Sequence, residues 1–477
     1  MDKPCQCPMS RRQFLQAAGG AAACWTLLPL SQSVLAADPI SRTPVFPKGK
    51  ARVTLVYTHI PSGNPTWPMK DYDYDGRASE LTDKLVKACP GTRFTVKKAH
   101  NAAEAEAIIK ESGDIDGYMV YALGIWPQTA NVFIHSGKPV LLVDDLFAGS
   151  GEVLIMAGVA AREKLPVVTV CSSDFQDVAT GVRLFETIRA LKESTILDVV
   201  DYDISGWADT FKASFGPTVL KMDSKELASY YSKADEREAE EWADLWIKQA
   251  KKVVEPTREE IVSSGKMYLA LCQAVADKRA DAVTLDCLGM FYTGRITAYP
   301  CLSHFQMNND GATGVCEGDV NSTGTQLMMR YLTGRPGYVS DPVIDTSKSE
   351  IIYAHCVSTN RVFGSKGKAN PYIIRSHAED GKGAVVQSLM PIGEPVTTLE
   401  TDVIGKRMVI HTGKTTRNVD EPKACRTKLA AKANAERILD NWGMGWHRVT
   451  IYGDYRKQAM DLARLMGITV FEEDKPA

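Results

Sequence analysis

The sequence predicts an α/β protein in which two parallel-sheet domains are followed by a β-rich, barrel-like C-terminal domain. Strand-like and helix-like segments alternate through the first three quarters of the chain, and the strands are short, continuous apolar runs. Such runs are typical of a parallel sheet that helices cover on both faces. From residue 350 onward, closely spaced strands are separated by Gly, Pro and Asp, which favours an antiparallel barrel. At 477 residues the chain is also too long for one hydrophobic core.

Residues 1–37 are predicted to be a twin-arginine export signal. Ser10, Arg11 and Arg12 open the motif, an Ala- and Gly-rich apolar run follows at 17–30, and small residues at 34–37 offer a cleavage site. The apolar run is too short and too rich in glycine to span a membrane comfortably. We therefore expect an exported, periplasmic protein.

The first α/β domain is expected at residues 50–172. Helical spacing appears at 78–88 and 101–111, between β-rich segments. The expected strands are 51–57, 94–96, 117–121, 139–143 and 166–170.

The second α/β domain is expected at residues 173–345, and both carboxylates discussed below fall within it. Its expected helices are 179–192 and 258–278, its expected strands 195–200 and 282–286. The charged stretch 224–251 is interpreted as a solvated helical face.

The C-terminal domain is expected at residues 346–477. No long helix is expected before 424–442. The expected strands are 351–357, 383–389, 395–400 and 405–411.

Composition excludes several classes of function. The formal net charge is −2 and no basic stretch is interleaved with aromatic residues, so nucleic acid is not an expected partner. After the leader, no apolar stretch reaches membrane-spanning length, so no membrane association is expected of the mature chain. Eight cysteines remain after the leader without a CxxC pair. Buried free thiols are the expectation, and a Cys316–Cys356 disulfide stays open.

The most informative segment contains Glu317 and, 24 positions later, Asp341, with His355 and His447 further on. Two carboxylates and imidazole form a mixed oxygen and nitrogen set, which suits a divalent cation of the Mn²⁺ type better than Ca²⁺ or a thiolate-bound metal.

Each of these residues also has a structural alternative. Glu317 precedes a helical stretch at 319–332 and could cap it. Asp341 precedes Pro342 and could be a turn residue. His355 lies in an expected strand, where a lone histidine is commonly a core or surface residue.

The segments 315–321, 331–341 and 446–452 resemble the L-fucose/L-arabinose isomerase superfamily. The resemblance implies that Glu317 is both metal ligand and proton-transfer base, and that Asp341 is the second ligand and assists the transfer. It implies that His447 completes the site from the third domain. His355 matches a ligand of the arabinose type, whereas Asp at 341 matches the fucose type. A homo-oligomer is expected by resemblance only.

Four further residues are candidates for binding the substrate: Asp286, His304, Asn308 and Trp446. Asp286 ends an expected strand, and ligands of open α/β sheets bind at the carboxyl ends of strands. Asp319 is expected to support the start of the helix beside Glu317.

These features predict a metal-dependent aldose–ketose isomerase that acts through an enediolate on a small, open-chain sugar. The expected cofactor is a divalent metal, Mn²⁺ first, with Mg²⁺ or Co²⁺ as alternatives. Two other functions stay open at this point: another carbohydrate-active enzyme, such as a lyase or epimerase, and a non-catalytic periplasmic sugar-binding protein.

Overall fold

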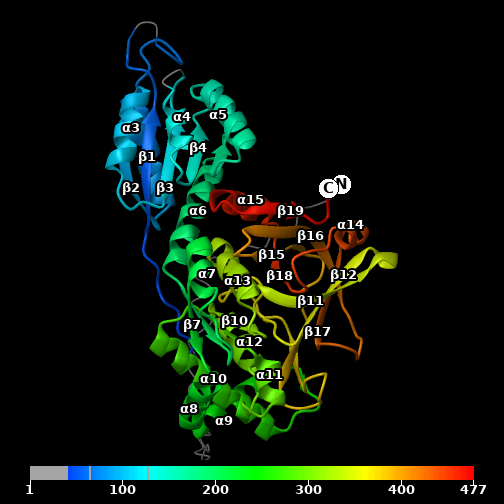
Figure 1. Ribbon diagram of the computed structural model, residues 1–477. Helices are drawn as coiled ribbons and strands as arrows, with labels where there is room; N and C mark the ends of the chain where they lie inside the picture. Colours follow the sequence, from blue (N-terminus) through cyan, green and yellow to red (C-terminus); the bar gives the residue numbers. More distant parts are fainter. Residues whose placement is uncertain (1–40, 64–65, 126–127, 477) are drawn as a thin grey trace, which may run out of the picture. The chain divides into compact units, whose positions relative to one another are not determined.

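The computed structural model describes residues 41–63, 66–125 and 128–476. The expected export signal lies outside these residues. Within them the predicted fold class is confirmed: two parallel sheets with helices are followed by a β-rich C-terminal region (Figure 1). Among the helices of the described residues, none is both long and apolar enough to cross a membrane.

The first sheet has five parallel strands in the order β2-β1-β3-β4-β5. Its strands are β1 (Ala51–Thr58), β2 (Thr92–Ala99), β3 (Gly117–Ala122), β4 (Val140–Asp144) and β5 (Val167–Val170). Its helices are α2 (Tyr74–Ala88), α3 (Ala102–Glu111), α4 (Thr129–Ile134), α5 (Ser150–Glu163) and α6 (Phe175–Lys192).

Alternation along β1 explains why helices cover both faces of this sheet. Leu55 and Tyr57 join one core with α2 and α6, while Val56 joins another with α3, α4 and α5. Successive side chains of a strand point to opposite faces, so a strand that is apolar throughout needs cover on both.

The second sheet has four parallel strands in the order β10-β9-β6-β7. Its strands are β6 (Thr195–Val199), β7 (Thr218–Met222), β9 (Ala282–Leu285) and β10 (Thr313–Cys316). The helices of this region are α7 (Ala208–Phe215), α8 (Ser224–Lys233), α9 (Glu236–Gln249), α10 (Arg258–Lys278), α11 (Cys287–Tyr292), α12 (Cys301–Asp310) and α13 (Val320–Thr333). Asp235 caps α9, so the charged stretch forms two helices rather than one.

The C-terminal strands form a closed antiparallel barrel. The order β15-β18-β11-β12-β17-β16 closes because β16 also pairs with β15, and β19 adds in parallel to β16. The strands are β11 (Tyr338–Asp345), β12 (Glu350–His355), β15 (Pro395–Asp402), β16 (Arg407–Asn418), β17 (Thr427–Lys432), β18 (Arg448–Tyr452) and β19 (Thr469–Glu472). The helices here are η1 (Thr346–Lys348), α14 (Ala435–Asp440) and α15 (Arg456–Leu465).

Two features of this region differ from the sequence expectation. The segment 424–442 is not one helix: it holds β17 and the short α14, because Thr427–Lys432 pairs with β12 in the barrel. Strand β11, placed by sequence at the end of the second domain, also belongs to the barrel. A small third sheet, β14-β13-β8, joins β8 (Lys252–Val253) to β13 (Tyr372–Arg375) and β14 (Val385–Ser388).

Helix α13 connects the second sheet to the barrel. It packs against α6 on one side and against barrel strand β15 on another (Figure 1). Asp319 caps its N-terminus, and Gly334, with a positive φ, ends it. The residues just before α13 therefore face the barrel.

Candidate metal centre

Glu317 lies in a tight turn between β10 and α13. Its φ is +68° and that of Gly318 is +63°. A positive φ is costly for a residue with a side chain, and such conformations cluster at functional sites. The cap of α13 is Asp319 rather than Glu317, so the capping alternative does not apply to Glu317. The turn leaves its carboxylate at the carboxyl end of a parallel strand, where ligands commonly bind.

Asp341 and His355 lie on two neighbouring barrel strands. Asp341 in β11 is opposite Ala354 in β12, which places His355 beside it. The Nδ1 atom of His355 accepts hydrogen bonds from the backbone N–H groups of Cys356, at 2.9 Å, and Val357, at 3.2 Å. These bonds fix the ring with its Nε2 atom toward Glu317.

His447 immediately precedes β18, the neighbour of β11 on its other side. Arg448, the first residue of β18, is opposite Ser340 in the barrel register. Pairing between β11 and β18 thus sets His447 next to Asp341, more than one hundred positions earlier in the chain.

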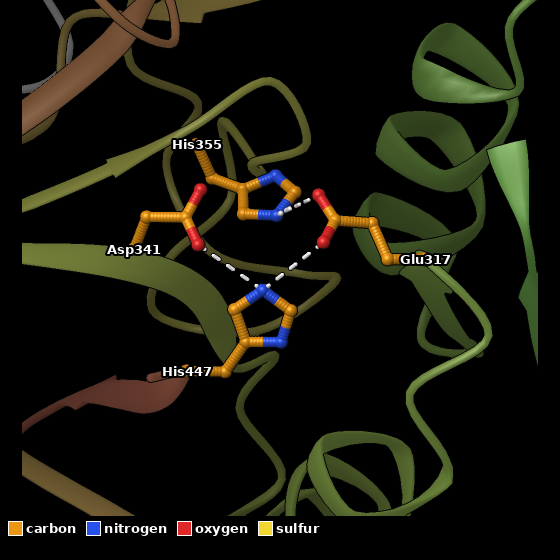
Figure 2. A group of neighbouring side chains, drawn as sticks. All are labelled: Glu317, Asp341, His355 and His447. Carbon is orange, nitrogen blue, oxygen red and sulfur yellow. Dashed lines mark ion pairs between the residues drawn. The ribbon is translucent and has the colours of Figure 1, made fainter. Parts of the chain in front are cut away.

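The four side chains converge on one point (Figure 2). One ligand atom from each lies within 4.8 Å of the others. The Nε2 atom of His447 is 3.3 Å from Oε2 of Glu317 and 3.1 Å from Oδ1 of Asp341. The Nε2 atom of His355 is 3.6 Å from Oε1 of Glu317. The structure thus brings together the four residues predicted as metal ligands.

Electrostatics favour charged groups at this site. Burial opposes ionisation of Glu317 and Asp341, but the hydrogen bonds from His447 and the two nearby imidazoles keep the pKa of both carboxyls below its usual value. Burial also opposes a charge on His355: it lowers the pKa of this imidazole, which stays neutral. For His447, burial is outweighed by Asp319, Asp341 and Glu317, which raise its pKa to about 12. Without a cation, a proton on His447 therefore holds the carboxylates together.

The donor set of the cluster indicates that a cation fits here. Oδ1 of Asp341 and Oε2 of Glu317 both face the Nε2 atom of His447, at 3.1 and 3.3 Å, so two carboxylate oxygens and a ring nitrogen surround one point. Two carboxylates and an imidazole suit a divalent cation of the Mn²⁺ or Mg²⁺ class, with nitrogen favouring Mn²⁺. The cluster thus fits a divalent metal.

Asp319 holds the ring of His447 from behind. The Nδ1 atom of His447 is 2.7 Å from Oδ2 of Asp319, and the hydroxyl of Ser322 donates to the same oxygen at 2.6 Å. That hydroxyl is also 3.1 Å from Glu400, a buried group whose pKa is raised well above its usual value by burial and then by the charge of Asp319. A carboxylate on the far nitrogen of a ligating histidine fixes its tautomer and orientation.

Two cavities meet at the cluster. One of about 470 Å³ is lined by Glu317, His447 and, among others, Asp402. The other, of about 190 Å³, is lined by Glu317, Asp341, His355 and several cysteines. Trp446 lines both cavities and is 62 % exposed. A small ligand could therefore reach the cluster from either side of Trp446.

Of the other candidate substrate residues, none lines these two cavities. Asp286 caps α11 through the N–H of Gly289, close to the turn at Gly318. Asn308 is buried and exchanges two hydrogen bonds with the backbone of Gly314, which ties α12 to β10. His304 is fully buried in α12, and burial, then His355, lower its pKa to about 3.

Sequence reasoning missed three groups that the structure places at these cavities. His377 lines the smaller cavity and stacks on Tyr299, with ring centroids 4.6 Å apart. Glu400 lines the larger cavity, and Cys425 the smaller. No local pattern marks them, because all three reach the site from barrel strands and loops distant in sequence.

Comparisons with known proteins give one distant likeness. No protein-family model matches the sequence. The chain is similar to sulfoquinovose isomerase of Priestia aryabhattai and of Priestia megaterium, at 23% identity over 305 residues in both cases. The match covers 60% of this chain and 66% of each relative, so the chain spans just under two thirds of the length of the curated relatives it matches. The likeness is to proteins named as isomerases.

Proposed function

We propose that this protein is a metal-dependent aldose–ketose isomerase that acts on an open-chain sugar through an enediolate. The observation that carries the proposal is the convergence of Glu317, Asp341, His355 and His447 within 4.8 Å, beside two cavities. The distant relatives named as isomerases support it, as does the resemblance to the L-fucose/L-arabinose isomerase superfamily.

Glu317, Asp341 and His447 would hold the cation, with His355 beside them. When bound, a divalent cation supplies Lewis acidity to the carbonyl and adjacent hydroxyl oxygens of the sugar and so favours loss of the proton between them. Asp319 keeps His447 oriented for this role through Nδ1.

The proton transfers fall to the two carboxylates. Glu317 takes the proton from the carbon next to the carbonyl group, which gives the enediolate, and returns it to the former carbonyl carbon. Asp341 takes the proton of the hydroxyl group and returns it to the other oxygen. No atom is gained or lost, so an aldose becomes its ketose isomer. Both carboxyls have a pKa below the usual value and are therefore ionised and able to accept a proton near neutral pH.

The substrate test follows from the relatives. Both are named sulfoquinovose isomerase, so sulfoquinovose is the first sugar to test. Sulfoquinovose, glucose, L-arabinose and L-fucose, each incubated with protein and Mn²⁺, Mg²⁺ or Co²⁺ in heavy water, would be followed by NMR. The proposal expects a ketose product from at least one sugar, with deuterium incorporated at C1 or C2. Turnover without any deuterium uptake would instead indicate a hydride shift.

Glu317→Gln tests the assignment of the base. The change keeps the size of the side chain but removes its charge, so the rate should fall by about 10²–10⁴-fold or more. Asp402→Asn is the matched control, because Asp402 lines the same cavity but is paired with Arg407 at 2.6 Å, outside the cluster. A Glu317→Gln variant that isomerises as fast as the control would remove Glu317 from the mechanism.

A further inference from the structure

A buried carboxyl group is linked to the metal cluster by a chain of hydrogen bonds. It belongs to Glu400, which lies near the end of barrel strand β15 and is 4 % exposed. The proton transfers proposed above do not use this group. A glutamate is rarely this deeply buried unless partners satisfy its oxygens, so the hydrogen bonds of Glu400 decide which protonation state it has.

The link between Glu400 and the cluster runs through the hydroxyl group of Ser322. The Oγ atom of Ser322 is 2.6 Å from Oδ2 of Asp319 and 3.1 Å from Oε2 of Glu400. A serine hydroxyl has one hydrogen to donate, and its oxygen can also accept. Ser322 can therefore donate to one of the two carboxyl groups only. The other hydrogen bond is made only if that second carboxyl carries a proton and donates it.

The surroundings assign the ionised state to Asp319. Besides the hydroxyl of Ser322, Asp319 accepts the backbone N–H of Ser322 at 3.0 Å and the Nδ1–H group of His447 at 2.7 Å. In spite of burial, these partners keep the pKa of Asp319 below its usual value. Hydrogen bonds to the charged form of a carboxyl favour that form. The single hydrogen of Ser322 is therefore donated to Asp319, the nearer of the two groups.

Glu400 is left with too few donors to be ionised. Among the described residues, its other oxygen, Oε1, has one donor, the hydroxyl of Thr325 at 3.5 Å. The guanidinium of Arg448 is already paired with another carboxylate. Burial, and then the charge of Asp319, raise the pKa of Glu400 well above its usual value, although Arg448 and His447 act in the opposite direction. A buried carboxylate with so little compensation is costly, whereas a protonated carboxyl completes the bond to Ser322.

We propose that Glu400 is a positioning residue that carries a proton at neutral pH and donates a hydrogen bond to the hydroxyl of Ser322. The hydrogen bonds then all point toward Asp319. Glu400 donates to Ser322, Ser322 donates to Asp319, and Asp319 also accepts from Nδ1 of His447, whose Nε2 atom faces the cluster. The donor behind Ser322 keeps its hydroxyl turned toward Asp319. The effect on His447 rests on the proposed metal centre, whereas the proton on Glu400 does not.

Two substitutions separate this role from the filling of space. Glu400→Gln keeps the shape of the side chain and still offers an N–H donor to Ser322, so the affinity for Mn²⁺ should change little. Glu400→Met keeps much of the bulk but has no donor, so the affinity should fall by about 2–10-fold, the contribution of one hydrogen bond. Calorimetry with the full chain measures both. Equal losses in the two variants would overturn the role as a donor.

Infrared spectroscopy in heavy water detects the proton itself and does not require Glu400→Met to fold. A protonated carboxyl group and a carboxylate absorb at different frequencies, and at neutral pH Glu400→Gln should lose an acid band. Glu193→Gln is the matched control. In spite of partial burial, the backbone N–H of Gly49 and then Arg189 hold the pKa of Glu193 below its usual value, so its loss should remove a carboxylate band. A carboxylate band lost in Glu400→Gln would overturn the proposal.

A double-mutant cycle tests whether the effect passes through Ser322. Ser322→Ala should weaken Mn²⁺ binding, and Glu400→Met added to it should weaken binding no further, because the bridging hydroxyl is already gone. Full additivity of the two losses would refute positioning through Ser322. A protein that shows the acid band of Glu400 but binds no Mn²⁺ in any form would refute the metal centre, and the positioning role with it, and leave the protonated Glu400 standing.

Discussion

Binding of a divalent cation should release one proton from His447. In the structure, the charges of Asp319, Asp341 and Glu317 raise the pKa of this imidazole to about 12 in spite of its burial. The ring therefore carries two protons at neutral pH. One stays on Nδ1, which is 2.7 Å from Asp319. The other, on Nε2, lies between Glu317 and Asp341, where the cation must bind.

The magnitude follows from the position of that pKa. At pH 6–8 the ring is fully protonated without metal, so the whole proton has to leave when Nε2 becomes a ligand. Glu317 and Asp341 are already ionised, and His355 is already neutral, so they add no further proton. As the pH rises, the Kd for the cation should therefore fall about tenfold per pH unit, so the free energy of binding becomes more favourable by about 1.4 kcal/mol per unit.

Calorimetric titration with Mn²⁺ in buffers of different ionisation enthalpy measures the protons released per cation. We expect about one for the natural protein and none for His447→Gln, with affinity measured between pH 6 and 8. Ser322→Ala is a milder control, because it removes a donor to Asp319 but leaves His447 intact. A cation that binds with an affinity independent of pH, without proton release, would refute the assignment of His447 as a ligand.

Three further predictions concern single residues. His447→Ala should weaken metal binding by about 100-fold or more, whereas His355→Ala should weaken it by less than about tenfold. The reason for the difference is that Nδ1 of His355 accepts backbone N–H groups, so the neutral ring keeps its proton on Nε2, the nitrogen that faces the cluster. Equal losses of affinity for the two variants, measured by calorimetry, would contradict this. Burial, and then the charges of nearby carboxylates, raise the pKa of Asp198 in the folded protein to about 7. Between about pH 4 and 7 the carboxyl of Asp198 is therefore protonated in the folded state and ionised in the unfolded state, so the free energy of unfolding falls as the pH rises through this range. Asp198→Asn should therefore raise the free energy of unfolding at pH 8 by up to about 4 kcal/mol, and by little at pH 4, in urea titrations; an equal effect at both pH values would refute the assignment. Arg448→Met should lower the free energy of unfolding by up to about 3–5 kcal/mol, because buried Glu473, 2.5 Å from Arg448, loses its guanidinium partner and is left with the imidazole of His411 at 2.9 Å; an unchanged urea midpoint would contradict that.

Much of the architecture follows from local sequence. Continuous apolar strands such as 117–121 require cover on both faces, which predicts the parallel sheets. Asp319 and Gly334 mark the ends of α13 by capping chemistry that depends on neighbouring residues only. The segment 424–442 was mispredicted for the opposite reason. Its strand β17 exists because β12 and β16 pair with it, and local helix preference gives way to that pairing.

The sequence by itself determined the residue types of the site and the spacing between Glu317 and Asp341. The spacing between Glu317 and Asp341 depends on a strand, a turn and a helix that are consecutive in the chain. Only the tertiary structure decided that His447 meets Glu317, that Asp319 lies behind His447, and that Cys425 contacts Asp341. These contacts require closure of the barrel, in which β11 pairs with β18 and β12 with β17. Pairing between segments so far apart depends on the stability of the whole sheet and leaves no local pattern in the residues it joins.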